Sequence, residues 1–556
     1  MPRFSILTPV FETPADVLAA MLASVRRQRF DEWELCLVDD CSGEPHVGEM
    51  LASAQRKDAR VRVHRRESNG GIVAASNDAL AMAQGEFVAL LDHDDELHPK
   101  ALAHVNAALV ATPDADYLYT DEDKIDRGGR HSAPFFKPDW SPERMRTQMY
   151  TCHLSVLRRS LVEEVGGFDS EFEGSQDWDL ALKVTERARR VVHIPKVLYH
   201  WRTLETSAAG GGEEAKPWAF EAGTRAIQAH CDRVGLPAKA ERDESAPGVY
   251  HLRPRLKTQP PVSIVIPTAG RSREVRYENV VLVAHCVRSI LRTTSYSNYE
   301  IVCVADASVD PDVLAELRHA GGDRLRIVGY DEPFNFSAKV NRGAVHSDGE
   351  HLLLLNDDME VATPDWIERL VMYSEIAGVG AVGARLLWED GRLQHAGILF
   401  ENGGYPGHIY RGFGGESGAY SNNVLVAQNY LAVTGACLMT RRDAFEEVGG
   451  FSTTLPVNYN DMDYCLKQQA AERRVVYDPD TVLYHFESSS RSTEVEDWEK
   501  ELLLDRWFSI TATDPSTNPN LRHGIPRISA SLRSMSPFRP PWIRRLVRRA
   551  PAQSAR

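Results

Sequence analysis

Short, nearly continuous apolar runs alternate along the chain with longer stretches in which apolar residues recur at helical spacing. Runs of the first kind are typical of strands that are covered on both faces of a sheet. They include LCLV at 35–38, FVALL at 87–91 and HLLLL at 351–355. Stretches of the second kind predict helices, for example at 19–28, 46–56 and 73–83. This alternation predicts an α/β fold with open, mostly parallel sheets.

The pattern occurs twice. Five landmarks of the first part return in the same order in the second part. They are FSILTPVF and VSIVIPTA (from 4 and 262), WELCLVDDCS and YEIVCVADAS (33 and 299), GEFVALLDHDDE and GEHLLLLNDDME (85 and 349), VEEVGGFD and FEEVGGFS (162 and 445), and KVLYHWR and TVLYHFE (196 and 481). Five matches in one order indicate an internal duplication.

The length of 556 residues exceeds what one hydrophobic core usually organises. We expect two tandem α/β domains at 1–208 and 259–520, a linker with a helix at 209–258, and a tail rich in Arg and Pro at 521–556. The net charge is −15, although residues 522–556 contain nine arginines and no Asp, Glu or Lys. The rest of the chain is therefore strongly acidic, which argues against a nucleic-acid partner, since such a partner needs a basic surface.

Carboxylates gather where the expected strands end. Asp40, Asp94, Asp306 and Asp358 lie at or just past strand ends, where open α/β sheets bind their ligands. The cluster DHDD at 92–95 crowds like charges, which a divalent cation would relieve. Mg²⁺ and Mn²⁺ bind one or two carboxylates and share their other positions with phosphates, which indicates a nucleoside diphosphate. The structural alternative is that Asp favours strand-to-helix turns and helix N-caps.

A second set of polar residues also recurs in both halves. Asp177 and Asp461 each follow a loop and open an apolar helix. Each is either an N-cap or a general base that removes a proton from an attacking hydroxyl. His200 and His485 come 23 and 24 residues later in the string LYH. A lone His there is often a packed residue, but its return in both halves favours a metal ligand or a phosphate contact.

These residues resemble glycosyltransferase family 2, whose members have the GT-A fold and transfer sugars from nucleotide donors with inversion. The resemblance covers residues 3–205 and 260–495. It rests on the opening strand with Pro, the Asp at the second strand end, the D-x-D cluster, the Asp-bearing helix and the late His. Longer strings resemble the tandem members that build O-antigen or capsule: YTDEDKID, FFKPDWSP, PFNFSAKVNRGA, LQHAGILF and VTGACLMTRR. The resemblance thus implies two Rossmann-like GT-A domains with a helical linker between them.

The resemblance also implies a role for each site residue of the first half. Asp40 would hold the nucleotide base beside Thr8 and Pro9. Asp92 would lie near the ribose, and Asp94 and His200 would hold a Mn²⁺ or Mg²⁺ ion that bridges the diphosphate. Asp177 would deprotonate the acceptor hydroxyl, which then attacks the anomeric carbon from the face opposite the leaving group.

The second half would hold a metal ion of its own. Asp358 and His485 would bind it, Asp461 would be the base, and the contacts to the nucleotide sugar would come from Pro267, Asp306 and Asp357. Two positions depart from the first half: Ala305 stands where it has Asp39, and Asn356 where it has Asp92. The second half is also longer between its acidic cluster and its base. The extra length contains His395 and His408 and is either an acceptor loop or a plain surface insertion.

The tail adds an expectation about the membrane. Trp542, Ile543, Leu546 and Val547 lie among arginines, and at helical spacing they share one side, which suits anionic lipid headgroups. The alternatives are a basic tail with no partner and a tail that folds against the acidic body. Since acceptors in the family are often lipid-linked glycans, we expect a cytoplasmic protein at the inner face of the cell membrane.

Three functions are compatible with these patterns. The first is a bifunctional, metal-dependent glycosyltransferase that uses UDP-, dTDP- or GDP-linked sugars to build a cell-surface polysaccharide. The second is one active transferase domain with a degenerate partner that only binds glycan. The third is a nucleotidyltransferase on a similar scaffold. It would show a basic, Gly-rich phosphate loop near the N-terminus, where this chain has the acidic VFETP.

Overall fold

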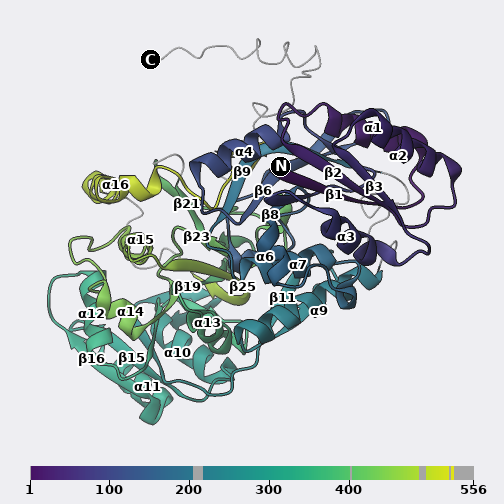
Figure 1. Cartoon of the computed structure of the whole chain (residues 1–556). Helices are drawn as coiled ribbons and strands as arrows, with labels where there is room; N and C mark the ends of the chain where they lie inside the picture. Colours follow the sequence, from purple (N-terminus) through teal and green to yellow (C-terminus); the bar gives the residue numbers. More distant parts are fainter. Residues whose placement is uncertain (1, 204–216, 401–403, 487–495, 525–526, 531–556) are drawn as a thin grey trace.

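The computed structural model describes residues 2–203, 217–400, 404–486, 496–524 and 527–530. Two large α/β halves lie beside each other, with the linker between them (Figure 1). Within the described residues, no helix combines the length and apolar character that a membrane span requires. The amphipathic run at 537–549 lies outside the described residues.

The first half is built on a nine-stranded sheet in the order β3-β2-β1-β4-β8-β6-β9-β5, with β7 paired to β6. The strands are β1 (Phe4–Val10), β2 (Trp33–Asp39), β3 (Val61–Arg65), β4 (Phe87–Leu90), β5 (Glu96–Leu97), β6 (Tyr117–Ile125), β7 (His131–Phe135), β8 (Ser155–Arg158) and β9 (Val191–Arg202). Strands β3, β2, β1 and β4 are parallel, and β8 runs antiparallel between β4 and β6.

Helices cover both faces of this sheet. They are α1 (Ala15–Arg26), α2 (Pro45–Lys57), α3 (Gly71–Met82), α4 (Ala101–Ala111), α5 (Pro142–Met145), α6 (Arg159–Glu164), the 3₁₀ turn η1 (Ser170–Phe172) and α7 (Gln176–Thr185). Apolar residues of α1, α2 and α4 form one buried cluster with the sheet, and those of α3, α6 and α7 belong to another. The near-continuous apolar strands therefore have the two-sided cover that their sequence predicts.

The second half repeats this sheet strand for strand, in the order β16-β15-β12-β17-β24-β19-β25-β18. Its strands are β12 (Val262–Thr268), β15 (Tyr299–Asp306), β16 (Leu325–Tyr330), β17 (His351–Leu355), β18 (Met359–Val361), β19 (Val379–Leu387), β24 (Cys437–Arg441) and β25 (Arg474–His485), with β20 (Leu393–His395) and β23 (Gln428–Tyr430) paired at its side. The identical order confirms the duplication and the predicted fold class of two tandem GT-A-like units.

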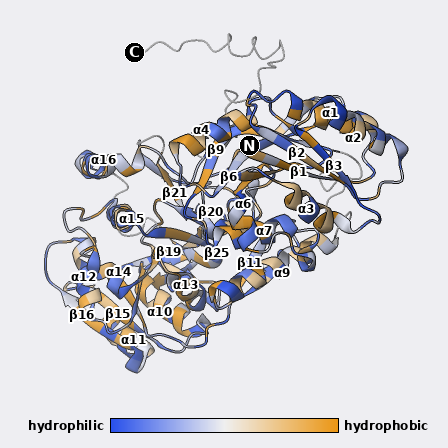
Figure 2. Cartoon of the chain, viewed as in Figure 1, coloured by the Kyte–Doolittle hydropathy of each residue, from blue (hydrophilic) through white to orange (hydrophobic). Residues whose placement is uncertain are grey.

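The helices of the second half are α10 (Leu282–Thr293), α11 (Pro311–Gly321), the 3₁₀ turn η2 (Gly322–Arg324), α12 (Phe336–Val345), α13 (Trp366–Ser374), the 3₁₀ turn η3 (Tyr420–Asn422), α14 (Arg442–Glu447), α15 (Asn460–Ala470) and α16 (Asp497–Thr511). Local sequence explains their starts: Asp310 caps α11, which has Pro311 at its first position, and Asn335 caps α12. Helix α11, for example, carries both hydrophobic and hydrophilic residues (Figure 2). Two-stranded ribbons complete the half: β13 (Ser272–Val275) with β14 (Glu278–Val281), and β21 (Ile398–Phe400) with β22 (Pro406–His408).

The linker contains the expected helix, α9 (Pro217–Val234), and a ribbon of β10 (Ala238–Arg242) and β11 (Tyr250–Pro254). Helix α9 packs on α7, and α16 packs on α15 in the same way. Each of the two packed helices carries an arginine that pairs with a buried aspartate. Arg233 of α9 lies 3.7 Å from Asp179, and Arg506 of α16 lies 2.6 Å from Asp463. The linker helix is therefore the counterpart of α16, so the duplicated unit extends past the last landmark seen in the sequence.

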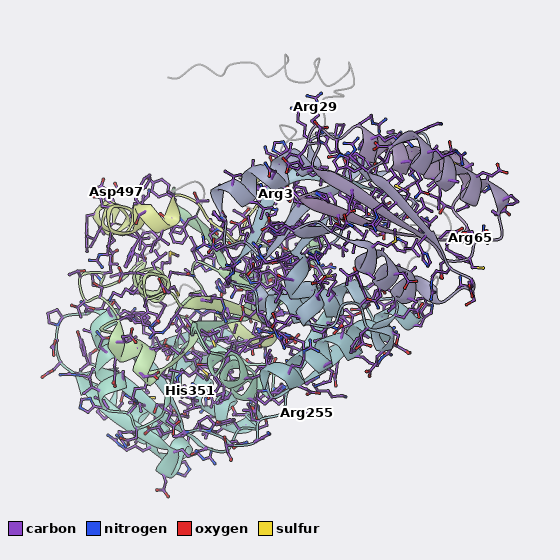
Figure 3. The ribbon with its side chains drawn as sticks, viewed as in Figure 1. Arg3, Arg29, Arg65, Arg255, His351 and Asp497 are labelled. Carbon is purple, nitrogen blue, oxygen red and sulfur yellow. The ribbon has the colours of Figure 1, made fainter. Side chains whose placement is uncertain are left out.

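The halves meet in a buried boundary. One apolar cluster includes Trp178 of the first half, Leu252 of the linker and Trp366 of the second half. Arg144 of α5, only 1% exposed, donates to Asn423 Oδ1 and Gln428 Oε1, both at 2.7 Å. Arg65 lies at the outer edge of the first half, and His351 lies within the second half (Figure 3).

After α16 the chain returns to the first half. Asn518 Nδ2 donates to both carboxylate oxygens of the buried Asp121 at 3.0 Å and to the carbonyl oxygen of Lys137 at 2.8 Å. Leu521 packs beside it against Phe136 and Val197. A last ribbon, β26 (Leu521–Gly524) with β27 (Arg527–Ala530), ends the described chain. Residues near the end of the sequence thus complete the packing of the first half.

Candidate active sites

A cavity of about 640 Å³ opens at the carboxyl ends of β1 and β2. Pro9 and Asp40, two of the residues expected at the nucleotide, line it together with His93. Its other walls include the start of α3, the start of α7 with Gln176, and the linker residues Trp218, Phe220 and Pro247. The sequence patterns did not indicate this role of the linker. The aromatic pair in PWAF was the available signal, because Trp is enriched at interfaces.

Asp40 lies in the cavity wall with its carboxylate already bound. Its two oxygens accept hydrogen bonds from the backbone N–H groups of Gly70 and Gly71, both at 2.9 Å, where α3 begins. Arg66 Nη1 lies 2.9 Å from the same carboxylate. Asp40 is therefore fixed by a helix N-terminus and a cation. Thr8, directly before Pro9, is fully buried, and its hydroxyl has no hydrogen-bond partner within the described part of the chain.

The acidic loop after β4 holds three carboxylates in different surroundings. Asp95 is buried and accepts hydrogen bonds from the Tyr199 hydroxyl (2.5 Å) and the Arg202 N–H (2.7 Å), so it anchors the loop. Burial and the neighbouring charge of Asp94 raise the pKa of Asp92. The side chain of Asp94 is half-buried. This crowding of like charges fits a divalent cation held by Asp92 and Asp94.

Asp177 lies in the first turn of α7, as predicted, with its Oδ1 2.9 Å from the backbone N of Trp178. Burial raises the pKa of Asp177, and the charge of His153 opposes that shift. A carboxylate whose pKa is raised toward neutrality is a better general base than an ordinary Asp. The charge of Asp177 raises the pKa of Asp92 and the charge of His153 lowers the pKa of both, so the three side chains are near enough to interact.

His153 belongs to this first-half site, and the sequence patterns missed it. It precedes β8, its Nδ1 lies 3.2 Å from Glu122 Oε1, and its ring stacks on Tyr199 with centroids 5.3 Å apart. Glu122 is in turn paired with the fully buried Lys137 at 2.8 Å. Burial alone would lower the pKa of His153, but Glu122, Asp95 and Asp92 outweigh it and raise this pKa to about 9. The first-half site therefore contains an imidazolium at neutral pH.

This pKa predicts a pH-dependent stability. A His whose folded pKa is raised stabilises the protein fully below the unfolded value of about 6.5 and loses that stabilisation as the pH rises through about 9. The loss amounts to roughly 3 kcal/mol, because each pKa unit is worth about 1.36 kcal/mol. We expect thermal melts of the wild type to fall more steeply between pH 6.5 and 9 than those of His153→Gln. Parallel curves for the two proteins would contradict this.

His200 does not lie where the repeat of LYH predicts. Its Nδ1 donates to Asp123 Oδ1 at 2.6 Å, and it pairs in register with Glu96. In the second half the partner of the corresponding Glu360 is Tyr484, and His485 is one residue further on. The register therefore matches His485 with Trp201. A shift of one residue turns a side chain to the other face of the strand, so the structure does not bring His200 together with Asp94 as His485 is brought to Asp358.

In the second half the expected metal ligands do meet. His485 Nε2 lies 3.1 Å from Asp358 Oδ1, and its Nδ1 donates to Gln394 Oε1 at 2.6 Å. The Nδ2 of Asn356 is 3.4 Å from His485 Nε2. A carboxylate oxygen and an imidazole nitrogen this close, with the imidazole oriented by an amide, form a donor pair that fits Mn²⁺ or a similar ion.

Asp461 lies in the first turn of α15 and accepts a hydrogen bond from the Gly435 N–H at 2.8 Å. The neighbouring Thr434 N–H donates to His395 Nε2 at 3.3 Å, and His395 Nδ1 is 2.9 Å from His408 Nδ1. His395 is fully buried, and its burial, with His408 and His485 nearby, keeps its pKa well below the usual value. The extra segment of the second half is thus packed into the site and is not a plain surface insertion.

The residues expected at the second nucleotide are also in contact with neighbours. Asp306 lies 2.7 Å from the Nζ of the buried Lys339, which also donates to the carbonyl oxygen of Thr268. Asp357 accepts a hydrogen bond from the Thr268 hydroxyl at 2.6 Å, while burial and Asp358 raise its pKa to about 6. Pro267 is buried within β12 beside them. Both halves therefore pair the Asp at the second strand end with a cation, Arg66 or Lys339.

Known proteins resemble this chain along most of its length. The family model "Glycosyl transferase family 2" matches residues 5–166 and 263–449. An uncharacterized protein of Sinorhizobium fredii, y4gI, is 41% identical over 532 residues, and the O-antigen biosynthesis protein RfbC of Myxococcus xanthus is 37% identical over 525. Each alignment covers 94% of this chain but only 58% and 40% of those relatives, so the chain spans about half their length.

Among solved structures, residues 1–349 of Staphylococcus aureus TarS share 22% identity with this chain at a TM-score of 0.33. That similarity covers 41% of this chain and 65% of the other. The family model matches both halves and more than half of all residues. The chain belongs to glycosyl transferase family 2.

Proposed function

We propose that the chain is a bifunctional, inverting glycosyltransferase that moves sugars from nucleoside-diphosphate donors to a growing cell-surface polysaccharide. One predicted catalytic unit is residues 1–208, on which α9 of the linker packs as α16 packs within the other predicted unit, residues 259–520. The observation that carries the proposal is the repeated site. In each half, carboxylates follow the fourth strand of the repeat (β4 or β17), and a second Asp opens the helix beside them.

The site side chains have different proposed roles in each half. In the first, Asp40 and the wall of the cavity hold the nucleoside, and Asp177 takes the proton of the acceptor hydroxyl. In the second, Asp306, Asp357 and Pro267 lie on the nucleotide side, and Asp461 is the base. Asp92 and Asp94 would hold a divalent cation in the first half, and Asp358 and His485 in the second. When bound, that cation supplies positive charge to the leaving diphosphate.

Support for a polysaccharide product comes from the relatives. RfbC is named for O-antigen biosynthesis, and a Pasteurella multocida chondroitin synthase is 26% identical over 201 residues. We propose a lipid-linked acceptor and attachment of the Arg-rich tail to the inner face of the membrane. Each basic residue near an anionic surface contributes about 1 kcal/mol, and the tail has nine arginines.

The second candidate is a chain with one active half. Its support is the sequence of the second half, where Ala305 and Asn356 replace acidic residues of the first. Against it stands the contact between Asp358 and His485, which preserves a metal-binding pair in the second half.

The function is tested by donor turnover. Full-length protein is incubated with UDP-, GDP- or dTDP-sugars, Mn²⁺ or Mg²⁺ and a lipid-linked or synthetic glycan acceptor, and release of the nucleoside diphosphate is followed. We expect one or two donors to be consumed only when both acceptor and metal are present. Release of pyrophosphate from a nucleoside triphosphate, with no consumption of any sugar nucleotide, would instead identify a nucleotidyltransferase.

A further inference from the structure

A cluster of metal-binding side chains lies outside the two sites described above. Asp123 of β6, His131 of β7 and His200 of β9 converge at the edge of the first sheet. Their donor atoms all lie within 4.8 Å of one another. His131 Nδ1 is 3.0 Å from Asp123 Oδ2, and His200 Nδ1 is 2.6 Å from Asp123 Oδ1. The two imidazoles therefore contact the same carboxylate, and each contacts a different oxygen of it.

This cluster is separate from the donor site. Tyr199 and Trp201 contact His153, and Tyr199 also binds Asp95 and the backbone of Asp92. His200 lies between them in β9, and successive strand residues point to opposite faces of a sheet. The ring of His200 instead lies 4.5 Å from that of His131 and 6.1 Å from that of His98. A ligand held by His200 is thus on the other side of the strand from the acidic loop.

The donor set suits a transition metal. Two imidazole nitrogens and one carboxylate oxygen are ligands of Zn²⁺ and its neighbours, whereas Mg²⁺ and Ca²⁺ take oxygen donors. The separations of 2.6 and 3.0 Å are those of hydrogen bonds. Ligands at about 2.0–2.2 Å from one tetrahedral ion lie roughly 3.3–3.6 Å apart, so the two rings would have to move away from the carboxylate by about 1 Å or less to admit the ion. Asp123 and His200 are buried, and His131 is partly exposed, so water can supply a fourth ligand.

The second half shows that the scaffold does not require these residues. Asp123 and His200 are register partners, and the matching partners in the duplicate are Leu387 and Tyr484. Its strands pair equally well without the carboxylate and without the imidazole. Asp123 and His200 are therefore features of the first half that the repeated strand pairing does not require.

We propose that Asp123, His131 and His200 bind a divalent transition metal, with zinc preferred, at a site distinct from both donor sites. Because the three ligands come from β6, β7 and β9, the ion would cross-link the β6–β7 hairpin to β9. Binding through these nitrogens requires Nδ1 to be unprotonated: a neutral imidazole then carries its proton on Nε2, and a protonated imidazole releases one proton, so binding weakens at low pH.

The test uses full-length protein that has been stripped with EDTA and then titrated with Zn²⁺ alone. Bound zinc is measured by mass spectrometry after gel filtration, and its affinity by competition with a chromophoric chelator. We expect one tight equivalent in the wild type and at least about a 100-fold weaker affinity for that equivalent in His131→Ala and His200→Ala, which each lose a ligand. Zinc should also raise the melting temperature of the wild type but not of these variants.

Matched variants separate this site from the others. Asp94→Asn and Asp358→Asn alter the expected donor-site ligands, and His153→Ala alters the neighbouring group of Glu122, Cys152 and His153. All three should keep the tight equivalent. His131 lies near the surface on a hairpin, so its variant guards against a folding defect in His200→Ala. The proposal is overturned if the wild type holds no tight zinc, or if His131→Ala holds as much as the wild type; the cluster is then a hydrogen-bonded triad without a metal.

Discussion

Asp177→Asn is expected to abolish one glycosidic linkage and Asp461→Asn the other, with a loss of about 10²–10⁴ in the rate of each. Each Asp lies in the first turn of a helix beside the acidic cluster of its own half. Asn keeps the shape of the side chain and its hydrogen bond from the following backbone N–H, but it cannot accept a proton. The measurement is product analysis of the two single variants and the double variant with donor, metal and acceptor.

The control is Asp497→Asn. Asp497 is also in the first turn of a helix, α16, but it is exposed and lies on the outside of the second half (Figure 3). This variant should keep both linkages. If Asp177→Asn stops all turnover and Asp461→Asn changes nothing, the second half is a binding module and its assigned base is wrong. Full activity in the double variant would exclude both residues as bases.

Arg144→Met is expected to be among the most destabilising single changes in the chain. The guanidinium is buried at the boundary between the halves and donates to Asn423 Oδ1, Gln428 Oε1, Gln148 Oε1 and the carbonyl oxygen of Ser421. Met fills similar space but leaves the three amide oxygens of Asn423, Gln428 and Gln148 without this donor, while the Ser421 carbonyl oxygen keeps a hydrogen bond from Gln148 Nε2. Each buried, unpaired acceptor costs about 1–3 kcal/mol. We expect a total loss of roughly 3–5 kcal/mol, measured as a lower midpoint in thermal and urea unfolding.

Arg127→Met provides the comparison for this prediction. Arg127 pairs with Asp16 at 3.1 Å, but both side chains are more than half exposed, and such pairs contribute about 1 kcal/mol or less. Its midpoint should stay near that of the wild type. Equal unfolding midpoints for Arg144→Met and Arg127→Met would show that the hydrogen bonds of Arg144 at the boundary do not contribute measurably to the free energy of unfolding.

Much of the architecture follows from local pattern. The strand ends at Asp40, Asp94, Asp306 and Asp358 can be read from apolar runs that stop at carboxylates, and the duplication from the order of the landmarks. The register of β9 cannot be read in this way. Aligning the LYH strings puts His200 and His485 at one position, whereas irregular pairing in β9 and β25 shifts them by one residue. Register depends on how strands meet, and a single sequence does not contain that information.

The site residues that were missed share one property: they reach the site from another part of the chain. His153 precedes an antiparallel strand and carries no motif, and its importance comes from Glu122, Asp92 and Asp95, which are distant in sequence. Trp218 belongs to a segment that reads as a linker, yet it helps to line the first-half cavity. Side chains that tertiary packing brings together leave no periodic signal.

The contact between Asn518 and Asp121 has a consequence for how the protein is made. The two residues are 397 positions apart, and a ribosome adds about 5–20 residues per second. Asp121 therefore emerges roughly 20–80 seconds before Asn518 exists to donate to it. During that time the carboxylate of Asp121 is held only by the Lys137 N–H and His193, which also donate to it. The first half reaches its final packing only after residue 518 has been made, and a chain truncated before residue 518 would leave it permanently at the earlier stage.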